Sequence, residues 1–405
     1  MENNPAYSPY TMGKSALNVQ QEMLEVSRKK ARIVIGIIKE AHETEKRVPL
    51  TPEAVELLVN NGHEILIESG TGAGANYSDA DYSERGAFIL NNRKEVMKAD
   101  VILKIAPLQL PEIEDLKGNQ LIISLLHLNG GTKEYIRALI QKKVTAVAAE
   151  NIQNEYNTFP VHHSMSAISG ITAIFVAAEL LSSMGNGKGV LLGGLAGITP
   201  TEVTILGAST AAEFAARAAL GLGASVRIFD NSIHRLNLLQ EKFGSQLYTS
   251  IFHPRVIEKA LRSADVVIGT LRNTDSSGFY ITEELVQVMK KGSVIVDLAT
   301  DHGGCFETSE CRTLKNPVFV KHDIVHYCIP NMPSRVARTA SIALSNVSTP
   351  LILNLGAAGG HNRFIKENAG FRNGVYIFNG ILTNATIGRK YDIPSQDISL
   401  LLAAF

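Results

Sequence analysis

Two periodicities alternate along most of this chain: short apolar runs, and longer stretches in which apolar residues recur every three or four positions. Mostly apolar runs of four to six residues lie at 32–37, 64–68, 101–105, 121–124 and 145–148. Their length predicts buried strands, and the segments between them predict helices. Thr51-Pro52 is typical of a helix start and Asn61-Gly62 of a helix end. This alternation favours a mostly parallel sheet flanked by helices.

A second unit of the same kind is predicted from about residue 161. A helix over 165–181 leads to a glycine-rich stretch, and further strands are predicted at 202–206, 225–229, 265–268 and 293–296. The strand at 202–206 turns at Gly207 into a helix, and Asp230 follows the next strand. This order is the layout of a dinucleotide-binding fold. Beyond about residue 338 the helical spacing resumes, and this segment can return to the first unit.

We therefore expect an α/β protein of two Rossmann-like domains. The expected boundaries are 1–30 for an N-terminal arm, 31–160 with 338–405 for a substrate and catalytic domain, and 161–337 for a nucleotide-binding domain. The arm starts with Pro5, Pro9 and Gly13 and then has helical spacing. It either packs against its own or a neighbouring subunit, or is a partly ordered extension.

Composition narrows the class of function. The chain has 405 residues, with 39 basic and 39 acidic side chains, so no basic surplus points to nucleic acid. Three cysteines argue against a disulfide framework, and the spacing of cysteine and histidine predicts no metal site. The longest apolar stretch, 170–181, is shorter than the ~20 residues of a membrane span, and the start of the chain lacks the apolar core of a signal peptide. We expect a cytoplasmic protein.

The turn after the strand at 202–206 carries an incomplete dinucleotide fingerprint. Residues 207–212 read G-A-S-T-A-A, where the full pattern is G-x-G-x-x-G or G-x-G-x-x-A. Gly207 supplies the tight turn, and Ala212 is small enough for close helix–strand packing. Ser209 departs from the pattern: its Cβ can obstruct the pyrophosphate, or its hydroxyl can donate to a phosphate oxygen. Asp230 lies where an acidic residue binds the ribose 2′-hydroxyl, which favours NAD over NADP.

Motifs in both units resemble the family of alanine dehydrogenase and the α-subunit of NAD(P) transhydrogenase. In the first unit they are K-E at 39–40, R-V-P-L-T-P at 47–52, N-G-H at 61–63, E-S-G-T-G-A at 68–73 and L-L-H-L at 125–128. In the second unit they are G-S-V-I-V-D at 292–297, D-H-G-G at 301–304 and the segment 325–333. The resemblance runs in order from about residue 33 to about 385. It implies an active site in the cleft between the two domains, and NAD-dependent, reversible oxidative deamination of L-alanine to pyruvate and ammonia by a homo-oligomer, usually a hexamer.

The resemblance also implies roles for individual residues. Arg47, Lys104 and Asn331 correspond to substrate-binding residues, His127 to the general acid/base and Asp301 to the catalytic aspartate. Arginine can hold a carboxylate with two hydrogen bonds, and histidine titrates near neutrality. The expected contacts of the cofactor are Ser166, Gly207, Ser209, Ala212, Asp230 and Met332. A lysine that ends an apolar strand, as Lys104 does, also needs a buried partner for its charge.

Two departures from the family pattern leave other functions open. The family has an acidic residue and a proline directly after the lysine, whereas I-A-P at 105–107 follows Lys104 here, and Ala167 stands where the family has glutamate. One alternative is a transhydrogenase-type module that binds NAD(H) and passes hydride to a partner protein. The absence of arginine from 151–164, together with the presence of Lys104 and His127, disfavours it. The other alternative, a non-catalytic paralogue with weakened NAD binding, has Ser209 as its main support.

Overall fold

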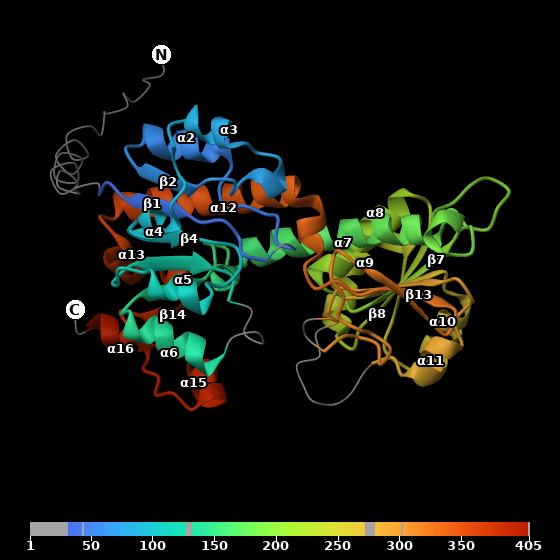
Figure 1. Cartoon of the computed structure of the whole chain (residues 1–405). Coiled ribbons are helices and arrows are strands. Elements are labelled where there is room, and N and C mark those ends of the chain that lie inside the picture. Colours follow the sequence, from blue (N-terminus) through green and yellow to red (C-terminus); the bar gives the residue numbers. More distant parts are fainter. Residues whose placement is uncertain (1–30, 43, 127–131, 272–279, 301–302, 404–405) are drawn as a thin grey trace, which may run out of the picture.

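The computed structural model describes residues 31–42, 44–126, 132–271, 280–300 and 303–403, which form two α/β units, each built on one sheet (Figure 1). The prediction of two α/β units with mostly parallel sheets is confirmed. The N-terminal arm, 1–30, lies outside the described residues.

The first sheet combines the N-terminal part of the chain with a segment from the C-terminal end. Its order is β15-β14-β6-β5-β4-β1-β2-β3, in which the pairs among β1–β6 are parallel and β14 and β15 are antiparallel to their neighbours. The strands are β1 (Val34–Ile37), β2 (Glu64–Glu68), β3 (Phe88–Leu90), β4 (Val101–Leu103), β5 (Leu121–Ser124), β6 (Thr145–Ala148), β14 (Val375–Phe378) and β15 (Ile381–Leu382). The predicted strand at 101–105 is shorter than expected, because it ends at Leu103 just before the buried Lys104.

Helices cover this sheet. They are α2 (Pro52–Asn60), α3 (Asp79–Ser83), α4 (Arg93–Val96), α5 (Leu110–Glu114), α6 (Lys133–Gln141), α12 (Ala337–Ala357), α13 (His361–Glu367), α14 (Ala369–Arg372), α15 (Ala385–Tyr391) and α16 (Ile398–Ala403). The cap expected for α2 is present: the Thr51 side chain accepts a hydrogen bond from the Ala54 N–H, and Pro52 is the first helical residue.

The second sheet has the strand order of a dinucleotide-binding fold. Its order is β12-β13-β11-β10-β7-β8-β9, and apart from the antiparallel edge strand β12 the pairs are parallel. Counted without β12, this is the 3-2-1-4-5-6 order, whose ligand crevice lies where the order reverses between β7 and β10. The strands are β7 (Glu202–Leu206), β8 (Ser225–Phe229), β9 (Leu247–Ser250), β10 (Val266–Gly269), β11 (Val294–Asp297), β12 (Val318–Lys321) and β13 (Ile324–Tyr327). The helices are α8 (Thr210–Gly221), α9 (Ile233–Phe243), α10 (Pro254–Ser263) and α11 (Glu283–Gln287).

A long helix, α7 (Pro160–Leu181), runs from the first unit into the second (Figure 1). It begins five residues earlier than predicted, with Pro160 at its first position. Its C-terminal half contributes Ala173, Ile174, Ala177 and Leu181 to the core of the second unit, and the helix packs against α8 and α12. By length and hydropathy α7 and the segment Met332–Ala357 are apolar enough to cross a membrane, but half or nearly half of each apolar window is buried inside the protein. Two such helices are weak evidence for a membrane protein, because core helices of soluble proteins can have the same length and hydropathy.

Gly170 sets the close approach of α7 to α8. A Cβ at this position would lie 2.1 Å from the backbone oxygen of Ala211 and 2.9 Å from the backbone nitrogen of Ala215. Because both contacts are backbone atoms of one helix, the two helices would have to move apart to admit a methyl group.

We expect Gly170→Ala to lower the free energy of unfolding by about 1–3 kcal/mol through overpacking of this contact. The matched control is Gly221→Ala at the end of α8, where a Cβ meets nothing within 4 Å. The control is expected to be neutral or to stabilise by about 0.5–1 kcal/mol. Denaturant unfolding of both variants checks this, and equal effects of the two substitutions would contradict it.

Candidate active site

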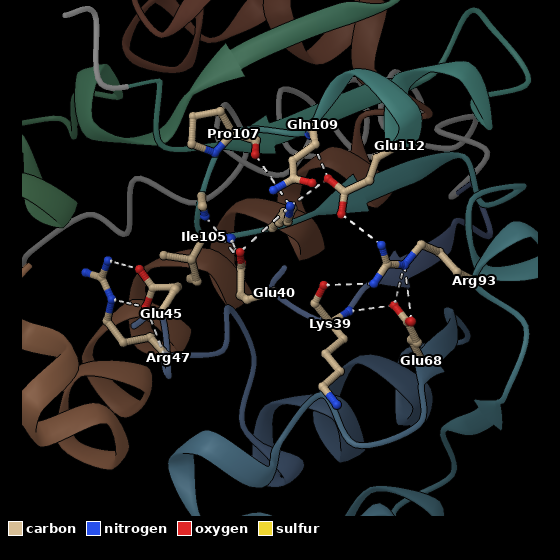
Figure 2. A network of polar contacts seen from close by, with 12 residues as sticks. Lys39, Glu40, Glu45, Arg47, Glu68, Arg93, Ile105, Pro107, Gln109 and Glu112 are labelled. Atoms are coloured by element: carbon tan, nitrogen blue, oxygen red, sulfur yellow. Dashed lines mark hydrogen bonds and ion pairs between the residues drawn. The ribbon is translucent and has the colours of Figure 1, made fainter. Parts of the chain in front are cut away.

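Charged side chains gather at one edge of the first sheet, where β1 and β4 end side by side. Ile37 of β1 is the register partner of Leu103 of β4, so the residues that follow both strands lie close together. A pocket of about 340 Å³ opens there, and Figure 2 shows part of its wall. Its lining residues are Lys39, Glu40, Ala41, His42, Glu45, Lys46, Arg47, Gly70, Thr71, Ala73 and Gly74.

Arg47 is buried, with 4% of its surface exposed, and is held by a two-point ion pair with Glu45. Its Nε and Nη2 atoms donate to the two Glu45 carboxylate oxygens over 2.8 and 2.6 Å. Burial alone would raise the pKa of Glu45, but the charge and hydrogen bonds of Arg47 outweigh it and hold that pKa below its usual value. The remaining Nη1 atom of Arg47 lies 3.3 Å from the sulfur of Met165 on α7. Glu45 therefore fixes the plane of the guanidinium group and leaves one of its edges for a ligand.

Asn331 joins the same group from the segment that follows β13. Its Nδ2 atom donates to Glu45 Oε2 over 2.9 Å. Three residues on, the Ser334 hydroxyl donates to the Thr44 carbonyl oxygen over 2.7 Å and accepts from the Lys46 N–H over 2.8 Å. Two expected substrate residues, Arg47 and Asn331, thus meet through Glu45, to which the sequence analysis assigned no role.

Lys104 is also buried, with 3% of its surface exposed, and it forms an ion pair with Glu112. Its ammonium group donates to Glu112 Oε2 on α5 over 2.7 Å and to the Pro107 carbonyl oxygen over 3.4 Å. Glu112 in turn accepts from Arg93 Nη1 over 3.1 Å and from the Gln109 N–H over 2.8 Å. The expectation that a buried lysine here needs a counter-charge is confirmed, although the sequence analysis did not identify Glu112.

Glu40, directly after β1, is the least satisfied charged group of this edge. Its Oε1 atom accepts from the Ile105 and Ala106 N–H groups over 2.7 and 3.3 Å. Its Oε2 atom is buried without a hydrogen-bond partner in the described structure and lies 3.9 Å from the Lys104 nitrogen (Figure 2). Burial raises the pKa of Glu40 to about 7; the positive charge of Lys104 opposes this shift and the negative charge of Glu45 adds to it. Glu40 therefore changes its protonation state near neutral pH.

The two residues expected to carry the chemistry, His127 and Asp301, lie outside the described residues. The described residues that precede His127 in the chain, Leu125 and Leu126, lie at the edge just described. The Leu125 N–H donates to the Ile105 carbonyl oxygen over 2.9 Å, and the Leu126 N–H donates to a Glu150 carboxylate oxygen over 2.9 Å. Residue 126 thus lies close to the segment that follows Lys104.

The turn between β7 and α8 has the features that a dinucleotide needs. Gly207 has a φ of +100°, and a Cβ there would lie 2.7 Å from the Thr270 hydroxyl, so this position requires glycine. Ser209 has a φ of −86° and caps α8: its hydroxyl accepts from the Ala212 N–H over 3.2 Å. The backbone therefore does not need glycine at position 209, and the hydroxyl hydrogen stays available to donate to a phosphate.

Asp230 directly follows β8, beside this turn. Its carboxylate accepts from the Ala208 N–H and from the Ser232 N–H, each over 2.7 Å. These two bonds fix the carboxylate next to the Gly207 turn, as the binding of a ribose hydroxyl requires. The residues of this crevice fit a dinucleotide.

The two remaining expected cofactor contacts lie apart from this turn. Ser166 is on α7, one turn before Gly170, and its hydroxyl lies 3.4 Å from His162 Nδ1. Met332 is buried in the core of the second unit. Within the described residues neither side chain forms a hydrogen bond with the Gly207 turn, and their role stays a prediction.

Comparison with known proteins gives one consistent result. The family models described as alanine dehydrogenase/PNT, N-terminal domain and C-terminal domain match residues 36–169 and 173–385. The alanine dehydrogenase of Staphylococcus saprophyticus is 36% identical over 372 residues, which cover 91% of this chain and 100% of that protein. Alanine dehydrogenase 2 of Staphylococcus aureus is 35% identical over 366 residues, with coverage of 90% and 98%.

Solved structures agree. An L-alanine dehydrogenase superimposes with a TM-score of 0.83 at 32% identity, covering 89% of this chain and 100% of the other. A transhydrogenase from Sinorhizobium meliloti superimposes with a TM-score of 0.73 at 22% identity, covering 87% and 99%, and this likeness shows the fold alone.

The raised pKa of Glu40 predicts a pH-dependent stability that Glu40→Gln removes. Between about pH 5 and pH 7 the folded protein holds a proton on Glu40 that the unfolded chain releases, so this stabilisation is lost as the pH rises through 7. Glutamine keeps the Oε1 acceptor and cannot ionise. We expect the variant and the wild type to melt together near pH 5, and the variant to melt a few degrees higher above about pH 8.

Scanning calorimetry from acid to alkaline pH measures this difference. Glu56→Gln, which removes an exposed carboxylate paired with Arg85, is the control and should show no pH-dependent difference. A Glu40→Gln difference that is constant with pH would mean that Glu40 titrates at an ordinary value.

Proposed function

We propose that this chain, which belongs to the alanine dehydrogenase/PNT family, catalyses the interconversion of L-alanine with pyruvate and ammonia. Membership of the family rests on two models that span residues 36–169 and 173–385, and relatives named alanine dehydrogenase match at least 90% of the chain. The structural observation that carries the proposal is the pair of buried cations, Arg47 and Lys104, each held in place by a carboxylate at the same sheet edge. Such fixed donors suit the carboxylate of an amino acid.

We assign the substrate carboxylate to Arg47 and Lys104. Arg47 uses Nε and Nη2 for Glu45, and we assign the ligand to Nη1, whose contact in the described structure is the weak acceptor Met165 Sδ at 3.3 Å. Lys104 has three N–H donors, of which two point to Glu112 and Pro107. The third remains for the substrate carboxylate or for the carbonyl oxygen of the keto acid. Asn331 contributes from residues 161–337, which we place in the nucleotide-binding domain, and contacts Glu45 in the domain of residues 31–160 and 338–405.

We assign proton transfer to His127 and the binding of ammonia to Asp301, both of which lie outside the described residues. His127 is proposed as the general acid and base that moves protons to and from the imine, the carbinolamine and water. Asp301 is proposed to hold the amine or ammonia and to orient the attacking water. Closure of the two units around the substrate would exclude bulk water during these steps.

The family and the Rossmann-type second unit imply a nicotinamide dinucleotide, which when bound would supply the acceptor and donor of the hydride exchanged with the substrate Cα. Within that class we propose NAD. Asp230 is fixed beside the Gly207 turn by two backbone N–H groups, where its carboxylate would bind a ribose 2′-hydroxyl and repel a 2′-phosphate. The pyrophosphate would lie at the N-terminus of α8, with Ser209 as a hydroxyl donor and Gly207 and Ala212 permitting the close approach.

We also propose a cytoplasmic homo-oligomer, with the hexamer that the resemblance implies and with no membrane or nucleic-acid partner. Its support is the apolar hairpin before β7, in which Leu191, Leu195 and Ile198 are 60–73% exposed. The neighbouring Leu222, whose carbonyl oxygen accepts from the Gly194 N–H, is also exposed. Gathered apolar side chains of this kind mark contact surfaces between protein chains.

Turnover is tested by the loss of NADH absorbance with purified protein, pyruvate and ammonium. Loss that requires both pyruvate and ammonium supports the proposal. NADPH and other keto acids are the controls for cofactor and substrate choice. NADH binding without turnover would favour the transhydrogenase-type module, and a failure to bind NADH would favour the non-catalytic paralogue.

His127→Ala is the matched variant for this assay. We expect kcat to fall by about 10²–10⁴-fold, because an acid/base group is lost, while NADH binding stays unchanged. Retained turnover would contradict the role of His127.

Asp230→Asn tests the choice of cofactor. Asparagine keeps one oxygen acceptor beside the Ala208 N–H but removes the negative charge, so we expect the preference for NADH over NADPH in kcat/KM to fall by about tenfold or more. Glu241→Gln, on the exposed side of α9, is the charge-matched control. An unchanged ratio in Asp230→Asn would show that its carboxylate does not select the cofactor.

A further inference from the structure

The charged groups around Lys104 do not balance. The cluster holds three cations and four carboxylates, namely Arg47, Arg93, Lys104, Glu40, Glu45, Glu68 and Glu112. Glu45 pairs with Arg47, Glu112 pairs with Lys104 and Arg93, and Glu68 pairs with Arg93. Glu40 is the carboxylate left over. With Glu40 ionised the cluster carries one net negative charge, and with Glu40 protonated it is neutral.

The geometry of Glu40 leaves one oxygen for a ligand. The Ile105 and Ala106 N–H groups fix Oε1, whereas Oε2 is buried, has no hydrogen-bond partner in the described structure and lies 3.9 Å from Lys104 Nζ. A buried oxygen without a hydrogen bond is costly and is rare in proteins. A ligand oxygen that accepts from Lys104 Nζ at about 2.8 Å can also lie at about 2.7 Å from Oε2. Because Oε2 is closed to solvent and Lys104 is not among the residues that line the pocket, a ligand oxygen takes this position only when it displaces the two side chains.

We propose that Glu40 takes up a proton from solvent when the keto acid binds, and donates it in a hydrogen bond from Oε2 to an oxygen of the keto-acid carboxylate. The inference rests on the proposed function, since it assumes that the pocket takes a keto acid and its amino acid. A keto acid brings one negative charge to a buried cluster that already has one carboxylate too many. Protonation of Glu40 removes the repulsion and turns the unpartnered oxygen into a donor.

Binding of the amino acid adds no net charge to the cluster. Its zwitterion is neutral overall, because the ammonium group accompanies the carboxylate, so its binding requires less proton uptake. Glu40 thus distinguishes the two substrates of the reversible reaction by its protonation state.

The surroundings of Glu40 make this exchange possible near neutral pH. Burial raises its pKa to about 7, against the charge of Lys104 and with that of Glu45. Glu112 from α5 shares Lys104 with Glu40, and Arg47, Lys39, His42 and Lys46 line the same pocket as Glu40. Lys39, His42 and Lys46 are exposed, and water screens their charges.

Isothermal titration of pyruvate into the NAD⁺-saturated protein tests the proposal, because no reductant is present and turnover cannot occur. Titrations in buffers of different ionisation enthalpy give the number of protons taken up. We expect uptake near zero at about pH 6 and close to one proton at about pH 8. The Kd for pyruvate should rise about tenfold per pH unit above about pH 7. L-alanine titrated into the NADH complex should show less uptake.

Glu40→Gln separates Glu40 from His127 and from every other titrating group. Its amide can donate at the position of Oε2, so the variant should bind pyruvate at about pH 8 at least as tightly as the wild type, with a smaller proton uptake and a flatter pH dependence. Glu56→Gln should behave as the wild type. The same proton uptake in Glu40→Gln and wild type, or a wild-type Kd independent of pH, would overturn the inference alone. Failure of the wild type to bind pyruvate with NAD⁺ would overturn the proposed function and this inference together.

Discussion

The first unit depends on the burial of one ammonium group. Lys104 follows β4, and its charge can leave water only if a counter-charge accompanies it. Glu112 on α5 supplies that charge, but Glu112 is itself buried and needs the second cation, Arg93 of α4, which in turn pairs with Glu68 at the end of β2. A chain of alternating charges thus ties two strands and two helices together at the pocket. Removal of one buried charged side chain would leave the charge of its partner buried without compensation. This destabilises a protein more than replacing both partners by apolar residues.

This constraint explains why both expected substrate cations are occupied before any substrate arrives. Arg47 and Lys104 each have a carboxylate partner, so their positions do not depend on a ligand, and the ligand meets donors that are already oriented. The cost is excess negative charge. Four carboxylates accompany three cations, and the carboxylate in excess is Glu40, whose buried Oε2 has no hydrogen-bond partner in the described structure. A site that is preorganised in this way is therefore sensitive to protonation.

Much of the fold was predictable from hydrophobic periodicity, because each buried parallel strand is a short apolar run that can be recognised by itself. The Gly207 turn and the need of Lys104 for a partner were also predictable, because each follows from one residue in one position. The identity of the partner of Lys104 was not predictable. Glu112 lies eight residues after Lys104 in a short helix, and the residues around it do not distinguish it from a solvent-exposed glutamate. The role of Glu45 was equally unpredictable, because the sequence does not distinguish it from a surface glutamate, whereas in the folded protein it is buried against Arg47. For Ser209 the sequence left obstruction and hydrogen bonding open; its capping geometry shows a backbone that does not require glycine.

The ion pair between Arg47 and Glu45 also connects the pocket to the second unit. Because Glu45 takes the Nε and Nη2 edge of Arg47, the edge left for a ligand is the one that faces Met165 of α7. Glu45 meanwhile accepts from Asn331, on the segment that returns from the second sheet to α12. Both segments that join the units therefore touch this one ion pair. A change in the angle between the units would move Met165 and Asn331 against a guanidinium fixed to the first sheet, so the shape of the ligand-facing edge is set by the relative position of the two units.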